Sequence, residues 1–219
     1  AGDRGNNRND AEMACGKSPT AATSASKMRE GSTSWWGRGR RAGARRYDLP
    51  GEGGSAHGPG TMAGGEKRVL FVCTGNTCRS PMAEGMFRAA VQEQEGFEVR
   101  SAGVAAFDGG GASSQTLEVL RKRGASLDGF RSQSVNEELM NWATHVFTMT
   151  RGPLETLQRM FPKAEEKLFL ACEFVDLPGR GVGADVPDPI GQGIGTYEEV
   201  AGTLEKAIPG ILGFIDQAG

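Results

Sequence analysis

Four consecutive apolar residues, 69–72, lead directly into a polar loop of sequence CTGNTCRSP, and this junction constrains the fold more than any other feature of the chain. A continuous apolar run rich in β-branched residues is typical of a strand buried on both faces of a parallel sheet. Apolar residues then recur at helical spacing from Met82 onward, with Pro81 suited to the first helical turn and Ser80 to its N-cap. The sequence therefore predicts a strand, a tight loop and a helix, in that order.

The same alternation continues to the end of the chain. Further strands are predicted over 97–103, 145–149 and 167–170, and further helices over 115–123 (ended by Gly124), 135–143, 154–160 and 197–215. A long loop, about 173–195, precedes the last helix, and Pro209-Gly210 is a candidate break or kink in that helix. Strands that alternate with helices imply an α/β fold with a parallel sheet covered on both faces.

Residues 1–65 differ sharply in composition from the rest. They hold 14 of the 34 glycines and only one residue from the set Ile, Leu, Val and Phe, which is Leu49. Without apolar side chains nothing offsets the loss of chain entropy on folding, so we predict a disordered Gly/Arg-rich tail at 1–65 and a folded domain at 66–219. Formal charges sum to +4 in the tail and −6 in the domain.

Three interpretations of this tail remain open. The basic cluster Arg38 to Arg46 lies beside Trp35 and Trp36 and could contact an acidic surface or RNA. The Arg, Ser and Ala content could instead mark a targeting peptide, although six acidic residues count against it. We favour an inert or over-extended N-terminus, with a natural start at Met62 that would leave a compact protein of about 158 residues.

Charge and cysteine content exclude several classes of protein. No stretch approaches the ~20 consecutive apolar residues of a membrane-spanning helix, and a net charge of −2 gives no overall attraction to phosphate backbones. Four cysteines in 219 residues do not make a secreted disulfide framework, so we expect a reducing, cytoplasmic location. We expect a monomer with neither membrane nor nucleic acid as a partner.

The loop after the first strand has the composition of an anion site. Cys73 and Arg79 are separated by five residues between a strand end and a helix start, where open α/β sheets bind anions. Inward-turned backbone N–H groups that hold an anion also stabilise a thiolate, and an arginine can bind two phosphate oxygens. Gly75 gives the loop conformational freedom, and Ser80 could donate a hydrogen bond to the thiolate. The pattern predicts a cysteine nucleophile that acts on a phosphoryl group.

Such a nucleophile needs an acid to protonate the leaving group. Neither histidine fits, because His57 lies in the tail and His145 opens a predicted strand. The long loop contains the run ADVPDPIG, with Asp185 and Asp188 just before the last helix. Asp188 is therefore the best candidate for the acid, and Asp185 is either a neighbour that tunes it or a solvated charge.

In these motifs the chain resembles the low-molecular-weight protein tyrosine phosphatase family. The resemblance rests on VLFVCTGNTCRSPMAE at 69–84, on Asp188-Pro189, and on a strand that ends with 101–103. It covers about 67–217 and implies a four-stranded parallel sheet flanked by helices.

The resemblance also implies roles for the loop residues. Cys73 is the expected nucleophile, Arg79 the phosphate clamp, and Asp188 the general acid and then base. The expected phosphate-binding residues are Thr74, Gly75, Asn76, Thr77, Cys78 and Ser80, with Ser101 in support. No metal or cofactor is expected. Phe130 departs from the family pattern, in which many relatives have a loop-bracing histidine.

Within the family the chain is more similar to the bacterial protein arginine phosphatases. They carry Thr where Thr77 stands, whereas tyrosine-specific members typically carry an aliphatic residue there. Ile190-Gly191 replaces the aromatic pair that sandwiches a phenyl ring. We therefore expect a phosphatase that hydrolyses phosphoarginine in phosphorylated proteins through a phosphocysteine intermediate, with phosphotyrosine as the alternative substrate.

Two other functions are weaker alternatives. A thioredoxin-coupled arsenate reductase shares this loop but needs a relay of further cysteines, and only Cys172 follows Cys78. A non-catalytic phosphate-binding module would be expected to lose the nucleophile or the acid. Cys78 is either inert packing or a partner of Cys73 in a reversible protective disulfide, whereas Cys172 is expected to be buried and Cys15 lies in the tail.

Overall fold

The computed structural model describes residues 66–218. The predictions made for the tail, including its disorder and a start at Met62, lie outside the described residues, as do Cys15 and His57.

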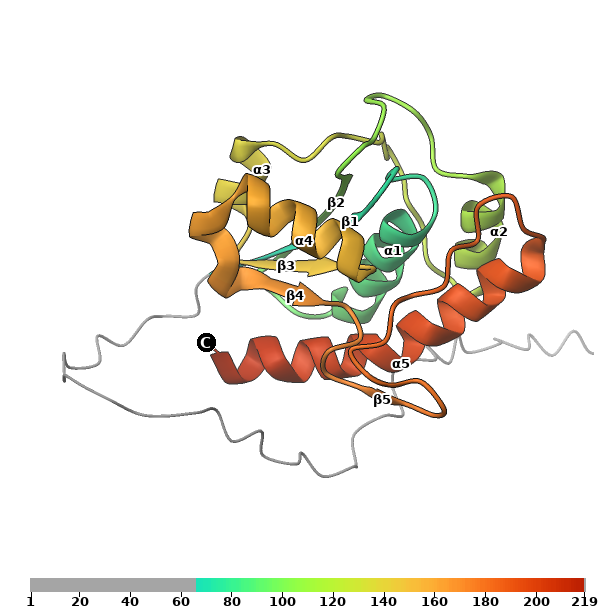
Figure 1. The fold of residues 1–219 in the computed structure, drawn as a ribbon. Coiled ribbons are helices and arrows are strands. Elements are labelled where there is room, and N and C mark those ends of the chain that lie inside the picture. Colours follow the sequence, from blue (N-terminus) through green and yellow to red (C-terminus); the bar gives the residue numbers. More distant parts are fainter. Residues whose placement is uncertain (1–65, 219) are drawn as a thin grey trace, which may run out of the picture. The chain divides into compact units, whose positions relative to one another are not determined.

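A four-stranded parallel sheet forms the centre of the fold, as predicted (Figure 1). Its strands are β1 (Lys67–Cys73), β2 (Phe97–Gly103), β3 (His145–Thr148) and β4 (Leu168–Leu170), in the order β2-β1-β3-β4. The register pairs Cys73 with Gly103 and Val72 with Thr148, so the ends of three strands meet at one edge of the sheet.

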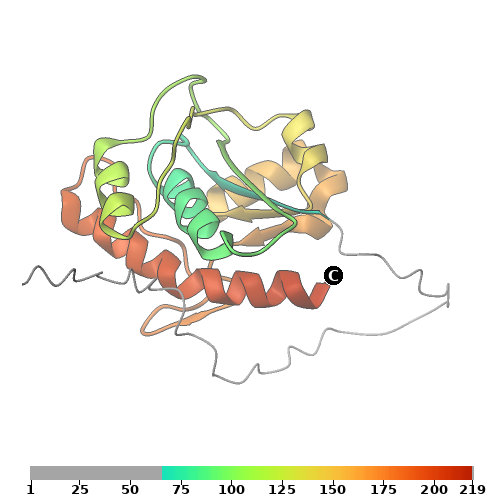
Figure 2. The same cartoon turned by 180° about the vertical axis from the view of Figure 1, so that it is seen from behind.

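Helices cover both faces of this sheet. Their bounds are α1 (Arg79–Val91), α2 (Ser114–Lys122), α3 (Glu137–Trp142), α4 (Arg151–Met160) and α5 (Ile194–Ala218), with a 3₁₀ helix η2 (Pro162–Lys167) after α4. Views from opposite sides show α3 and α4 on one face and α1, α2 and α5 on the other (Figures 1 and 2). The predicted α/β class is confirmed.

Alternate residues of β1 supply the two halves of the core. Leu70 and Val72 pack with residues of α3 and α4. Phe71 points to the other face, where its ring lies 5.4 Å from that of Phe87 on α1. This period of two is the geometry of a strand buried on both faces, and it explains the continuous apolar run in the sequence.

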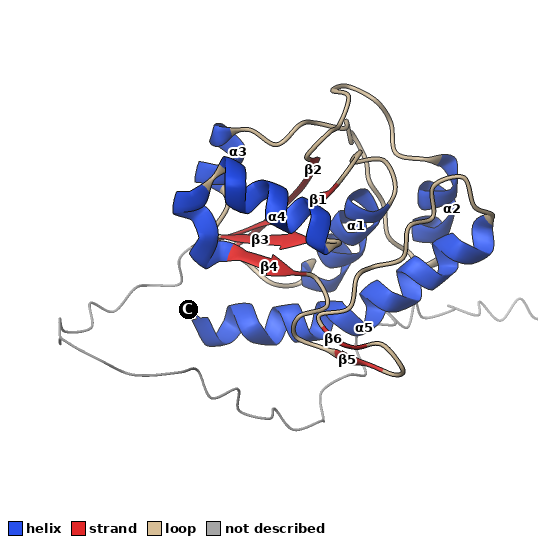
Figure 3. Cartoon of the chain, viewed as in Figure 1, coloured by secondary structure: helices blue, strands red, loops and turns tan. Residues whose placement is uncertain are grey.

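The predicted loop over 173–195 contains more structure than its sequence indicated. Two short antiparallel strands, β5 (Asp176–Leu177) and β6 (Gly181–Val182), form a hairpin inside it (Figure 3). Gly179 in the turn and Gly181 at the start of β6 adopt positive φ angles of 75° and 78°, a conformation that suits glycine. Two-residue strands are too short to leave a periodic signal.

The last helix is longer than predicted and is not broken. α5 begins at Ile194 and continues through Pro209. A proline in a helix interior costs ~3 kcal/mol or more, and the burial of apolar side chains on either side, such as Ile208 and Ile211, offsets that cost. Gly210 is required at this point because the carbonyl of Phe174 occupies the space of a β-carbon.

Candidate active site

The candidate site lies where β1 ends and α1 begins. Cys73 is the last residue of β1 and α1 starts at Arg79, so the loop between them lies at the carboxyl edge of the sheet. β1 has β2 on one side and β3 on the other. The connection after β1 leads to β2 on one side, and the connection after β2 crosses to β3 on the other side, so the strand order reverses at β1. Open α/β sheets bind ligands at such a position.

The Cys73 thiol is surrounded by hydrogen-bond donors. Its Sγ accepts from the backbone N–H of Asn76 at 3.2 Å and lies 3.0 Å from the hydroxyl of Ser80. Asn76 has a φ of 51°, which turns its N–H inward, and asparagine tolerates this conformation better than most residues. Ser80 was predicted as the N-cap of α1, but Cys78 occupies that position and the Ser80 side chain contacts the thiol instead. Both donors stabilise a thiolate over a thiol.

A buried hydrogen-bond network holds this loop. The side-chain amide of Asn76 donates to Ser80 Oγ at 3.0 Å and to Ser101 Oγ at 2.9 Å. Its carbonyl oxygen accepts from the backbone N–H of Gln133 at 2.9 Å. Gln133 was not predicted from the sequence, whereas Phe130 makes none of these bonds. The bracing expected from a histidine is supplied here by a backbone group, which no side-chain pattern reveals.

Gly103 lets β2 approach the loop closely. A β-carbon at this position would lie 2.5 Å from the carbonyl oxygen of Thr74 and 2.9 Å from the nitrogen of Asn76. The same Thr74 carbonyl accepts from the N–H of Ala105 at 2.9 Å. The loop is thus packed between β1 and the chain that follows β2.

The candidate acid reaches the loop from a distant segment. Asp188 Oδ2 lies 3.0 Å from Nη2 of Arg79, and the Arg79 side chain is 6% exposed while that of Asp188 is 55% exposed. Asp188 Oδ1 also accepts from the N–H of Ile190 at 3.2 Å. Asp185 points elsewhere and accepts from the N–H of Arg151 at the start of α4, at 3.0 Å. The structure therefore brings Asp188, not Asp185, to the arginine.

Comparisons with known proteins decide the family. Residues 68–218 match the model of the family described as low molecular weight phosphotyrosine protein phosphatase. The chain belongs to this family.

Relatives of both specificities are found within the family. The phosphatase is 40% identical over 141 residues to a protein-arginine-phosphatase of Geobacillus stearothermophilus, covering 64% of this chain and 90% of the relative. It is 36% identical over 154 residues to a low molecular weight protein-tyrosine-phosphatase of Streptomyces coelicolor, covering 66% of this chain and 91% of the relative. The solved structure of the YwlE arginine phosphatase of Geobacillus stearothermophilus superimposes on this chain with a TM-score of 0.62 at 38% identity. The match covers 69% of this chain and 94% of that structure. The fold and the enzyme class, a protein phosphatase, are thereby established.

The second loop cysteine of this phosphatase packs against α5. Cys78 Sγ lies 3.4 Å from the hydroxyl of Tyr197 and 3.5 Å from the hydroxyl of Thr77. Burial raises the pKa of Tyr197, and its hydrogen bond with Cys78 raises it further. Cys73 and Cys78 are both free thiols, so a disulfide between them stays a prediction. Tyr197 was not predicted because nothing local in the sequence connects it to the loop.

The remaining candidate residues lie away from the loop at 73–80. His145 pairs with Val69 at the start of β1, at the opposite end of the strand from Cys73, and its ring stacks on Phe147. Burial lowers the pKa of His145, and the positive charge of Lys67 lowers it further. Cys172 is fully buried, as predicted.

Among residues 66–218, no group of three or more His, Cys, Asp or Glu residues is placed to hold a metal ion. Within the same residues, no helix is long and apolar enough to cross a membrane.

Proposed function

We propose that this phosphatase hydrolyses phosphoarginine in proteins through a covalent phosphocysteine at Cys73. The observation that carries the substrate choice is the set of side chains next to the candidate nucleophile and acid. Thr77 carries a hydroxyl in the loop after Cys73, and Asp188-Pro189 is followed by Ile190, which is 58% exposed, and by Gly191, so no aromatic side chain stands there. The relative named a protein-arginine-phosphatase, at 40% identity, supports the same choice.

The geometry suits a double displacement. The Cys73 thiolate attacks phosphorus in line, while Arg79 and the loop N–H groups hold the equatorial oxygens as charge spreads over them. Asp188 lies on Arg79 and therefore beside the position of the bound phosphoryl group. It protonates the guanidinium nitrogen as the P–N bond breaks. Asp188 then takes a proton from the water that attacks the phosphocysteine, which releases phosphate and restores the thiolate.

Phosphotyrosine is the second candidate substrate, and the relative named a protein-tyrosine-phosphatase, at 36% identity, supports it. Phe107 is 92% exposed on the loop after β2, and this loop is fastened to the phosphate loop by hydrogen bonds from Ala105 N to Thr74 O and from Ser113 N to Thr77 O. An exposed ring can stack on a phenyl group or on a guanidinium. The two substrates must therefore be compared directly.

The test measures kcat/KM for matched phosphoarginine and phosphotyrosine peptides on the parent enzyme and on Thr77→Ile. The parent is expected to prefer phosphoarginine. An aliphatic side chain desolvates the guanidinium and suits the ring edge, so Thr77→Ile should move the ratio of the two kcat/KM values by about 10- to 100-fold toward phosphotyrosine.

Thr77→Val, which has the same shape as threonine without the hydroxyl, isolates the hydrogen bond, and Thr77→Ser serves as the control that keeps it. A parent enzyme that prefers phosphotyrosine would contradict the proposal. A ratio that does not move in Thr77→Ile or Thr77→Val would remove Thr77 as the determinant of specificity.

A further inference from the structure

Asp188 needs a support other than Arg79 during the proposed reaction. In the structure its Oδ2 accepts from Nη2 of Arg79 at 3.0 Å. As a general acid Asp188 carries a proton and is neutral, while Arg79 then binds the phosphoryl oxygens. The ion pair therefore does not hold Asp188 at the moment of phosphoryl transfer, and the support has to come from the chain before it.

The two prolines beside Asp188 restrict this part of the chain. The sequence is Val186-Pro187-Asp188-Pro189. Each proline has a fixed φ and confines the residue before it to an extended conformation. Val186 and Pro189 are both buried. Few dihedral angles are free between residues 183–186 and the carboxyl group, so the position of that stretch determines where Asp188 lies.

Two hydrogen bonds tie this stretch to the connection between β3 and α4. The N–H of Val186 donates to the carbonyl of Met149 at 2.8 Å. Asp185 Oδ1 accepts from the backbone N–H of Arg151 at 3.0 Å. A third hydrogen bond reaches the stretch from the β5–β6 hairpin, where Nη2 of Arg180 donates to the carbonyl of Asp185. The chain before Asp188 is thus held from two separate parts of the domain.

The hairpin that carries Arg180 is itself fixed to the core. Leu177 on β5 is 4% exposed, and its carbonyl accepts from the backbone N–H of Arg180 at 2.9 Å. Where the hairpin ends, the N–H of Gly183 donates to the carbonyl of Cys172, a buried residue, at 2.9 Å. The exposed Arg180 side chain therefore extends from an anchored backbone to the Asp185 carbonyl.

We propose that Arg180 is a positioning residue for the general acid: by holding the Asp185 carbonyl, it keeps the restricted run 186–189 where the Asp188 carboxyl group meets the leaving group. The inference rests on the proposed role of Asp188. It gives the β5–β6 hairpin, which the sequence did not predict, a role in the reaction.

The decisive variant is Arg180→Gln, which changes an exposed residue and should therefore fold. The shorter, uncharged side chain loses the hydrogen bond to the Asp185 carbonyl. The measurement is kcat/KM over a series of aryl phosphates with increasing leaving-group pKa. An activated leaving group departs without a proton, so its kcat/KM should stay at the parent value. For the poorest leaving group kcat/KM should fall about three- to tenfold, because the acid is held less well.

Two further variants test the route from Arg180 to the acid. In an Asp188→Asn background, Arg180→Gln should cause no additional loss, because no acid is left to position. Pro187→Ala frees the chain before Asp188 while Arg180 stays in place. It should therefore steepen the dependence on leaving-group pKa in the same way as Arg180→Gln.

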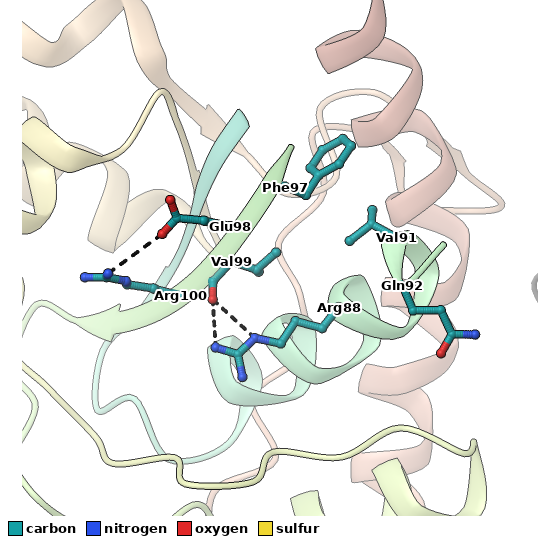
Figure 4. Close-up of a pocket in the computed structure, with 7 residues that line it drawn as sticks. All are labelled: Arg88, Val91, Gln92, Phe97, Glu98, Val99 and Arg100. Atoms are coloured by element: carbon teal, nitrogen blue, oxygen red, sulfur yellow. Dashed lines mark hydrogen bonds and ion pairs between the residues drawn. The ribbon is translucent and has the colours of Figure 1, made fainter. Parts of the chain in front are cut away.

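Arg100→Gln is the matched control. The Arg100 side chain is 46% exposed and lies on β2, where it pairs with Glu98 at 3.9 Å (Figure 4). Its dependence on leaving-group pKa should match that of the parent. Hydrogen exchange adds a readout that needs no turnover: the Val186 amide should exchange faster in Arg180→Gln than in the parent, and at the parent rate in Arg100→Gln.

Two results would overturn the inference. One is a dependence on leaving-group pKa in Arg180→Gln that equals that of the parent, whether or not the melting temperature falls, which would make Arg180 a structural residue only. The other is a loss from Arg180→Gln that is as large in the Asp188→Asn background as in the parent. Failure of the proposed role of Asp188 is separate, because it would appear in Asp188→Asn alone as an unchanged dependence on leaving-group pKa.

Discussion

The phosphate loop and the acid loop meet at Arg79 but are built in opposite ways. In the phosphate loop, residues 73–80, the side chains of Asn76 and Ser80 are fully buried and hydrogen-bonded within the core. In the acid loop, residues 184–193, Val186 is buried and its N–H donates to the carbonyl of Met149. Beyond Val186, the side chain of Asp188 is 55% exposed.

This difference matches the role that we propose for each loop. A nucleophile and its oxyanion donors act through alignment, which a packed and hydrogen-bonded core preserves. An acid that later serves as base must exchange protons with the leaving group and with water, which requires access to solvent. A substitution in the phosphate loop should therefore affect every substrate, whereas one in the acid loop should depend on the leaving group.

The largest effect is expected for Cys73→Ser. A hydroxyl is a poor nucleophile at neutral pH, so turnover should fall below about 10⁻⁴ of the parent while the loop still binds oxyanions. Phosphate turnover and the thermal shift produced by added phosphate measure the two properties. Cys172→Ala is the matched control, because it removes a buried thiol away from the loop and should keep turnover. Activity in Cys73→Ser near that of the parent would refute the assignment.

Asp188→Asn should have a smaller and substrate-dependent effect. Loss of the acid slows departure of a poor leaving group by about 10²–10⁴-fold, and an activated aryl phosphate should suffer least. The comparison is made from kcat over a series of aryl phosphates with increasing leaving-group pKa. Asp185→Asn is the control, since Asp185 accepts from Arg151 at the start of α4 and should mainly affect stability. A larger loss of kcat in Asp185→Asn would show that the acid is misassigned.

Two glycines allow the contrast to be tested through packing. An added β-carbon at Gly103 would collide with Thr74 and Asn76, whereas nothing lies within 4 Å of the same position at Gly193 in the acid loop. Gly103→Ala should destabilise the fold by about 1–3 kcal/mol and lower kcat for all substrates, because the loop backbone must move. Gly193→Ala should be near neutral in urea unfolding and in kcat. Equal effects of the two substitutions would contradict the proposed difference in rigidity.

The parts of the fold that the sequence predicted are those with a local signal. The strand at 69–72 and the helix after Ser80 follow from apolar periodicity, and the candidate nucleophile and arginine follow from their spacing across the junction. Asp188 was found because two aspartates stand together in a long loop, but its contact with Arg79 depends on the packing of segments 109 residues apart.

What the sequence could not predict depends on tertiary contacts. Gln133 acts through its backbone N–H, which leaves no residue pattern. Glu84 has the spacing of an ordinary exposed helical carboxylate relative to Arg88, and only its burial beside Ser101 distinguishes it. Pro209 indicates a helix end by its chemistry alone, and the buried face of α5 overrides it.

The smallest effect is expected at a cysteine that lies in the core but outside the phosphate loop. Burial raises the pKa of the Cys172 thiol to about 11, so about one molecule in 10³ carries the thiolate at pH 8. The Cys172 carbonyl also accepts from the N–H of Gly183 at 2.9 Å, which ties it to the segment leading into the acid loop. Iodoacetamide should therefore label Cys73 at least about a hundredfold faster than Cys172 in the native protein, as read by peptide mass spectrometry, and urea should abolish the difference. Alkylation of Cys172 requires local opening of this segment. Comparable alkylation rates for Cys73 and Cys172 in the native protein would therefore show that the segment before Val186 opens readily. The acid loop would then have no anchor in the core.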